Sequence, residues 1–111
     1  MRVDETRSGD VLVLALEGRL DGTTAPDLAH LLRERIDAGE RLFVFDVAAL
    51  SYVTSMGLRV ILGGVKELQG MAGRLVVAGA RGTVQEVLEI SGISRFVGMF
   101  GSREEALESF R

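Results

Sequence analysis

The sequence predicts a single α/β domain over residues 1–111, built as a mixed, largely parallel sheet packed with helices. Short runs rich in Val, Leu and Phe alternate with segments whose apolar residues recur at helical spacing, and turn-forming residues separate them. The helical segments are long enough to cross from one parallel strand to the next. A chain of 111 residues suits one core, and no repeat or linker divides it. The expected element order is ββαβαβαβα.

The expected strands follow from the apolar runs. The run of residues 11–16 comes after the turn Ser8-Gly9-Asp10, and residues 2–7 can pair with it as a hairpin that adds an antiparallel edge. Residues 18–23 are expected to form a loop. The strand over residues 96–100 is expected to be weak. The expected strands cover residues 2–7, 11–16, 42–47, 74–78 and 96–100.

The expected helices follow from apolar spacing and from their end signals. The first begins at Thr24-Ala25-Pro26-Asp27, where a hydroxyl suited to capping precedes an early proline and an acid in the first turn. Gly39 stands where a glycine that ends a helix belongs. The expected helices cover residues 24–38, 56–70, 83–91 and 103–110.

Composition excludes several classes of function. The formal net charge is −3 and no basic stripe is present, so nucleic acid is not an expected partner. The chain has no cysteine, which removes disulfides, thiolate metal sites and thiol nucleophiles. The longest apolar run, residues 11–16, is far shorter than the roughly 20 residues that span a bilayer. We therefore expect a cytoplasmic protein without membrane insertion.

The residues that could carry chemistry do not form a catalytic or metal site. His30 is the only histidine and lies opposite the apolar face of its helix, so a surface position is expected. Ser55 has no nearby base, and Asp21 and Asp46 are interpreted as a loop acid and a strand-end acid rather than a catalytic pair. The loop of residues 79–82 lacks the lysine of a P-loop. Neither enzymatic activity nor a metal or cofactor is expected.

The turn at Ser55 is the strongest candidate for a working surface. It follows the strand of residues 42–47 and opens a helix, which is where α/β folds tend to place their sites. A phosphoryl group on Ser55 would meet unpaired backbone N–H groups and the positive end of the helix dipole. The alternative is structural, with Thr54 or Ser55 acting only as the helix cap.

Three stretches of the chain resemble the STAS domains of anti-sigma factor antagonists. The first runs from Phe45-Asp46-Val47 through Leu50, Tyr52 and Val53 to Thr54-Ser55-Met56-Gly57-Leu58. The others are Gly18-Arg19-Leu20-Asp21 with Thr24-Ala25-Pro26, and residues 73–79 followed by Val87-Leu88. The resemblance covers nearly the whole chain. It implies the STAS fold and a role in partner switching that regulates bacterial transcription.

The resemblance also implies roles for single residues. Ser55 falls on the family's phosphorylated serine, Gly57 and Leu58 fall on its glycine and leucine, and Asp21 falls on a loop acid near that serine. Thr54 and Met56 differ, since the family motif has aspartate and a second serine there. The implied partners are an anti-sigma factor, itself a GHKL-type serine kinase, and a phosphatase. A homodimer is left open.

The helix after Ser55 adds a candidate partner surface. Helical spacing places Leu58, Ile61, Leu62, Val65 and Leu68 on a stripe expected to face the sheet. The opposite side carries Met56, Val60, Gly63, Gly64 and Glu67, an unusually small and apolar set for a solvated face. The alternative is that these small residues are incidental and that Met56 folds back onto the domain. The expected partner-binding residues are Asp21, Thr54, Ser55, Met56, Gly57, Val60, Gly63 and Gly64.

Three functions follow in order of preference. The first is an anti-sigma factor antagonist that binds the anti-sigma factor, releases the sigma factor and is switched off by phosphorylation of Ser55. The second is a STAS scaffold, or a subunit of a larger signalling or transport assembly, that works without phosphorylation; Thr54 and Met56 favour it. The third is a sensor of a small molecule or nucleotide.

Overall fold

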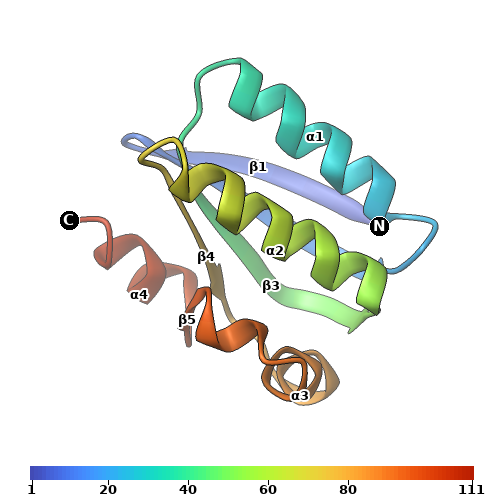
Figure 1. The fold of residues 1–111 in the computed structure, drawn as a ribbon. Helices are drawn as coiled ribbons and strands as arrows, with labels where there is room; N and C mark the ends of the chain where they lie inside the picture. The colour runs from blue at the N-terminus through green and yellow to red at the C-terminus, as the bar shows by residue number, and fades with distance from the viewer.

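The computed structural model describes all 111 residues and has a five-stranded sheet at its centre (Figure 1). The strands lie in chain order. Strand β1 pairs with β2 antiparallel, and every later pair is parallel, so the predicted mixed sheet with a hairpin edge is confirmed. The strands are β1 (Arg2–Ser8), β2 (Val11–Leu20), β3 (Leu42–Val53), β4 (Arg74–Ala78) and β5 (Gly98–Phe100).

Helices cover both faces of the sheet. Figure 1 shows α1 and α2 side by side across one face, and α3 also contributes buried side chains to the core on that face. Helix α4 packs on the opposite face over a smaller core. The predicted element order is confirmed, with one short 3-10 helix added before β5. The helices are α1 (Ala25–Asp37), α2 (Ser55–Gln69), α3 (Gly82–Ile90), η1 (Ile93–Arg95) and α4 (Arg103–Glu108).

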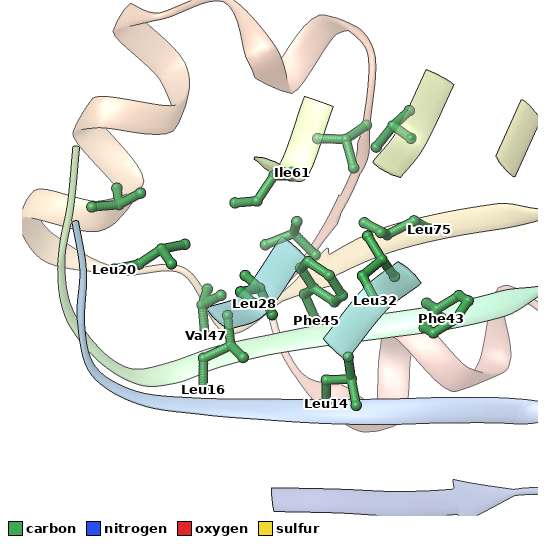
Figure 2. Packing of buried hydrophobic residues seen from close by; sticks show 14 of the residues in the cluster. Leu14, Leu16, Leu20, Leu28, Leu32, Phe43, Phe45, Val47, Ile61 and Leu75 are labelled. Atoms are coloured by element: carbon green, nitrogen blue, oxygen red, sulfur yellow. The ribbon is translucent and has the colours of Figure 1, made fainter. Parts of the chain in front are cut away.

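Alternating residues of each central strand face the two cores, which explains why these strands are continuous apolar runs. Leu14 of β2 and Phe45 of β3 point toward α1 and α2, where they meet Leu28, Leu32 and Ile61 (Figure 2). On the opposite face, buried valines of the same strands pack against Ala106 of α4. The main core holds 22 buried residues and the smaller one holds six, so most of the hydrophobic stabilisation lies on the α1 and α2 side.

Two strands extend beyond their predicted ends. β2 continues to Leu20 and β3 to Val53, so residues 18–20 are not the loop that was expected. The β2–β3 pairing has two register shifts, one on each side of Glu17-Gly18, and these let the strands stay paired beyond Gly18. Gly18 has a φ of 101°, which residues other than glycine rarely adopt. The extension places Leu20 opposite Val53. The loop after β2 and the turn after β3 therefore start at the same point of the sheet.

The C-terminal elements are shorter than predicted. β5 covers only Gly98–Phe100, because Ile93–Arg95 forms η1 and Phe96 is left outside the strand. α4 ends at Glu108 instead of residue 110. Gly39 and Gly92 have φ angles of 105° and 81°, as expected of glycines that end helical segments.

Candidate functional site

Ser55 is the first residue of α2 and is exposed at the carboxyl end of β3. Backbone hydrogen bonds fix the turn that carries it. The Thr54 N–H donates to the Leu20 carbonyl oxygen at 3.0 Å, and the Leu58 N–H donates to the Thr54 carbonyl oxygen at 3.0 Å. The end of β2 therefore holds the turn from one side while α2 begins on the other.

Thr54 occupies the N-cap position of α2, as the structural alternative expects, but no side chain caps the helix. Thr54 has extended backbone angles, φ −103° and ψ 175°, but its hydroxyl makes no cap bond. Thr54 Oγ1 is buried and has no hydrogen-bond partner. The first turn of α2 also contains no acidic residue. No residue of α2 itself therefore compensates the positive end of its dipole beside Ser55.

Asp21 lies in the neighbouring loop, where its carboxylate organises that loop. It accepts hydrogen bonds from the Thr23 hydroxyl at 2.7 Å, the Thr23 N–H at 3.0 Å and the Thr24 N–H at 3.3 Å. These bonds, led by the Thr23 hydroxyl, lower the pKa of Asp21 to about 2. The Arg19 Nε lies 3.6 Å from the same carboxylate. Asp21 is thus a fixed negative charge beside the Ser55 turn.

The predicted cap of α1 is also replaced by a loop contact. Thr24 stands at the N-terminus of α1, yet its side chain makes no cap bond to that helix. Its hydroxyl donates to the Arg19 carbonyl oxygen at 2.7 Å and accepts from the Asp21 N–H at 2.9 Å. The hydroxyl is therefore used to close the loop between β2 and α1.

Gly57 positions the first turn of α2. It is buried, and a Cβ atom built on it would lie 2.6 Å from Leu20 Cγ and 2.9 Å from Val53 Cγ2. Only a glycine permits this close approach of the helix to the ends of β2 and β3. Gly57 thus acts on the site by holding Ser55 in place.

The predicted partner face of α2 is only partly exposed. Met56 is 43% exposed, Val60 is half-buried, and Gly63 is exposed with nothing within 4 Å of a Cβ built on it. Gly64 does not lie on this face as expected. It is buried where α1 packs on α2, and a Cβ there would lie 2.7 Å from Leu32 Cδ2. The reason is that α1 crosses α2 at this turn, which a single helical wheel does not show.

A shallow groove of about 300 Å³ follows the contact between α1 and α2. Val60 and Gly63 line it, together with Arg59. Arg33 of α1 and Glu67 of α2 also line it and form an ion pair across it. The small residues of α2 therefore open into a groove with charged walls.

A second hollow lies on the other side of Ser55. Leu58 and Leu62, which were expected to face the sheet as core, are half-buried and line an open hollow of about 250 Å³. Both still pack against the main core, but the residues of η1 and of the end of α3 that line the hollow leave their outer sides open. The hollow is lined by Ser55, Leu58, Arg59, Leu62, Ser91, Ile93 and Phe96.

Two residues of this hollow were missed by the sequence reasoning. Arg59 lies four residues after Ser55 in a helix, so its place on the same face could have been derived from spacing. Phe96 is 60% exposed and was assigned to a strand. Its position depends on the turn of η1, which no local sequence pattern predicts.

The other candidate residues lie where they cannot form a shared centre. The exposed His30 pairs with Glu34 at 3.2 Å on α1. Asp46 lies within β3, not at its end, and accepts hydrogen bonds from the Ala48 N–H and the Arg103 Nε, each at 3.0 Å. No group of three or more metal-ligating side chains is present. None of the four helices combines the length and apolar character that a bilayer-spanning helix needs.

Comparisons with known proteins identify the fold and the family. The STAS domain family matches residues 2–106. BtrV of Bordetella bronchiseptica, assigned as an anti-sigma factor antagonist, is 34% identical over 111 residues, which is 100% of this chain and 96% of BtrV. The anti-sigma factor antagonist SpoIIAA in its unphosphorylated form is 25% identical, with a TM-score of 0.85 over 99% of this chain and 96% of SpoIIAA. The phosphorylated form of SpoIIAA, from Bacillus, is 24% identical, with a TM-score of 0.77 over 99% of this chain and 100% of that one.

Proposed function

The chain belongs to the anti-sigma factor antagonist family of STAS domain proteins, which are non-enzymatic regulators, and we propose that it binds an anti-sigma factor through the surface around Ser55. Binding would release the sigma factor held by that partner. One observation carries the proposal: Ser55 stands exposed at the start of α2, where no side chain caps the helix. The motif resemblance supports it, since it assigns Ser55 to the family's phosphorylated serine. The partner proposed from the family is a GHKL-type serine kinase in the cytoplasm, with a phosphatase that reverses its action.

We further propose that phosphorylation of Ser55 switches binding off. The N-terminus of α2 favours a phosphate, since α2 has neither a side-chain cap nor an acidic residue in its first turn. The phosphate would add roughly −1.5 to −2 of charge beside Met56, which is 43% exposed. An apolar or acidic partner surface that docks on unmodified protein would then meet a strongly hydrated anion. That SpoIIAA has a phosphorylated and an unphosphorylated form supports this part of the proposal.

The experiment begins with capture of the partner from the native cytosol, using wild type and Ser55→Ala, with intact-mass analysis of bound and free protein. The captured anti-sigma factor is then purified and titrated calorimetrically with Ser55→Glu and Val60→Asp. Both substitutions are expected to weaken binding about tenfold or more, because each places a charge on the docking surface. Thr83→Glu is the matched control, because it adds the same charge to the exposed first turn of α3.

A phosphorylation-independent scaffold is the second candidate. It is favoured by Thr54, because this neutral residue stands where the family motif has an acid and leaves its hydroxyl buried without a partner. Two results together would select this candidate over the switch. Wild type, Ser55→Ala and Ser55→Glu would bind the partner with the same affinity, and Ser55 would show no mass increase of 80 Da, roughly one phosphoryl group.

A further inference from the structure

The hollow between α2 and η1 exposes apolar surface next to Ser55. Phe96, which lines the hollow, is 60% exposed, a high value for a large apolar side chain. Leu58, Leu62 and Ile93 continue the apolar wall inward from Phe96. Large apolar side chains exposed together beside a candidate site are typical of a protein-binding surface.

The charged residue that lines this hollow, Arg59, is positive and unpaired. Among the twelve arginines, only Arg59 and Arg95 make neither a hydrogen bond nor an ion pair; every other one contacts a carboxylate or a backbone carbonyl. Arg59 lines the hollow, and Arg95 directly precedes Phe96 in the chain. None of the seven lining residues is acidic. In a protein whose net charge is −3, a hollow whose one charged lining residue is the unpaired Arg59 fits an acidic occupant.

We propose that this hollow receives an acidic, apolar segment of the anti-sigma factor, with Phe96 as the apolar contact and Arg59 as the contact for a carboxylate. The inference rests on the proposed function and adds the chemistry of the partner and a second contact region beyond the Met56 and Val60 face. Aromatic and arginine side chains are the residues that most often dominate binding energy.

The same geometry explains how Ser55 would control this contact. Ser55 and Arg59 are four residues apart in α2 and line the same hollow. A phosphate on Ser55 would form a charge-assisted pair with the Arg59 guanidinium and take it from the partner's carboxylate. The switch would then act by competition for one arginine as well as by repulsion.

The test measures the affinity of the purified anti-sigma factor for Phe96→Ala and Arg59→Glu by calorimetry. Each is expected to weaken binding about tenfold. Met71→Ala is the control for Phe96→Ala, since Met71 is 40% exposed beyond the far end of α2. Lys66→Glu is the control for Arg59→Glu, since Lys66 is an exposed, unpaired cation in the last turn of the same helix. Both controls are expected to stay within about twofold of wild type.

A double-substitution cycle tests the competition. Ser55→Glu is expected to reduce the affinity for the anti-sigma factor several-fold less in an Arg59→Ala background than in wild type. The reason is that the arginine with which the introduced carboxylate would pair is then absent. Thermal unfolding of each variant shows that it is folded.

A second probe is a helical peptide with Leu and Phe on one face and flanking Glu residues, added to isotope-labelled protein. It should shift the resonances of Phe96 and Arg59, whereas the same peptide with Lys in place of Glu should not.

The outcomes separate this inference from the function on which it rests. If wild type binds the anti-sigma factor and both variants bind equally well, the hollow is not the contact and only this inference falls. If Arg59→Glu strengthens binding, the occupant is basic and the proposed chemistry is wrong. If wild type binds no anti-sigma factor, the proposed function fails and the inference fails with it.

Discussion

At the scale of single residues, two threonines with the same predicted role behave differently. Thr24 and Thr54 both precede a helix, and neither caps it. The Thr24 hydroxyl makes hydrogen bonds within its loop, whereas Thr54 Oγ1 is buried without a partner. A buried hydroxyl that has lost its contacts with water and gained none costs free energy.

Replacing each threonine with valine should therefore change stability in opposite directions. Thr54→Val keeps the shape of the side chain and removes the unpaired hydroxyl, so we expect the free energy of unfolding to rise by about 1 kcal/mol. Thr24→Val should lower it by about 0.5–1.5 kcal/mol, because it removes the hydrogen bonds with the Asp21 N–H and the Arg19 carbonyl oxygen. Urea unfolding of both variants is the measurement. A loss of stability in Thr54→Val would show that its hydroxyl has a partner in solution.

At the scale of the element, the glycines of α2 serve three different purposes. Gly57 allows the first turn to approach β2 and β3, Gly64 allows α1 to pack closely, and Gly63 is open to solvent. A helix made only for stability would not contain a solvent-facing glycine, since alanine is favoured there. Gly63 is thus the glycine of α2 that folding does not require.

Alanine at these positions should separate folding from binding. Gly63→Ala should raise the free energy of unfolding by about 0.5–1 kcal/mol, because it adds helix propensity without a contact. Gly57→Ala should lower it by about 1–3 kcal/mol, because its Cβ would overlap Leu20 and Val53. Chemical unfolding tests both. If Gly63→Ala gains stability but loses affinity for the anti-sigma factor, a partner occupies the groove between α1 and α2.

At the scale of the whole molecule, the two faces of the sheet differ in how strongly they are held. The main core under α1 and α2 has 22 buried residues, and the core under α4 has six. α4 has only six residues, and polar contacts help to hold it, above all the ion pair of Arg103 with Asp46. We therefore expect α4 to open first, without disturbing the Ser55 site on the other side.

Native-state hydrogen exchange in low urea should reveal this difference. The amide of Ala106 is expected to exchange at a lower opening free energy than that of Ile61 in α2. Arg103→Gln should lower the opening free energy of α4 by about 1–2 kcal/mol, since it removes a partly buried charged hydrogen bond. Arg111→Gln is the control, because its ion pair with Glu108 is exposed. Equal protection of α2 and α4 would contradict the expectation.

The sequence by itself determined the fold class and the element order, and it predicted Ser55 as the centre of the candidate site. These depend on local patterns: apolar runs such as residues 42–47, helical spacing, glycines after helices, and a motif whose residues adjoin one another. Only the tertiary structure decided which neighbours each helix face meets. It buried Gly64 under Leu32, left Leu58 and Leu62 beside an open hollow, and brought Phe96 to the same hollow as Ser55. The physical reason is that the helical repeat decides only which side chains share a face of the helix. Which helix, strand or solvent region each face meets depends on contacts between residues far apart in the chain.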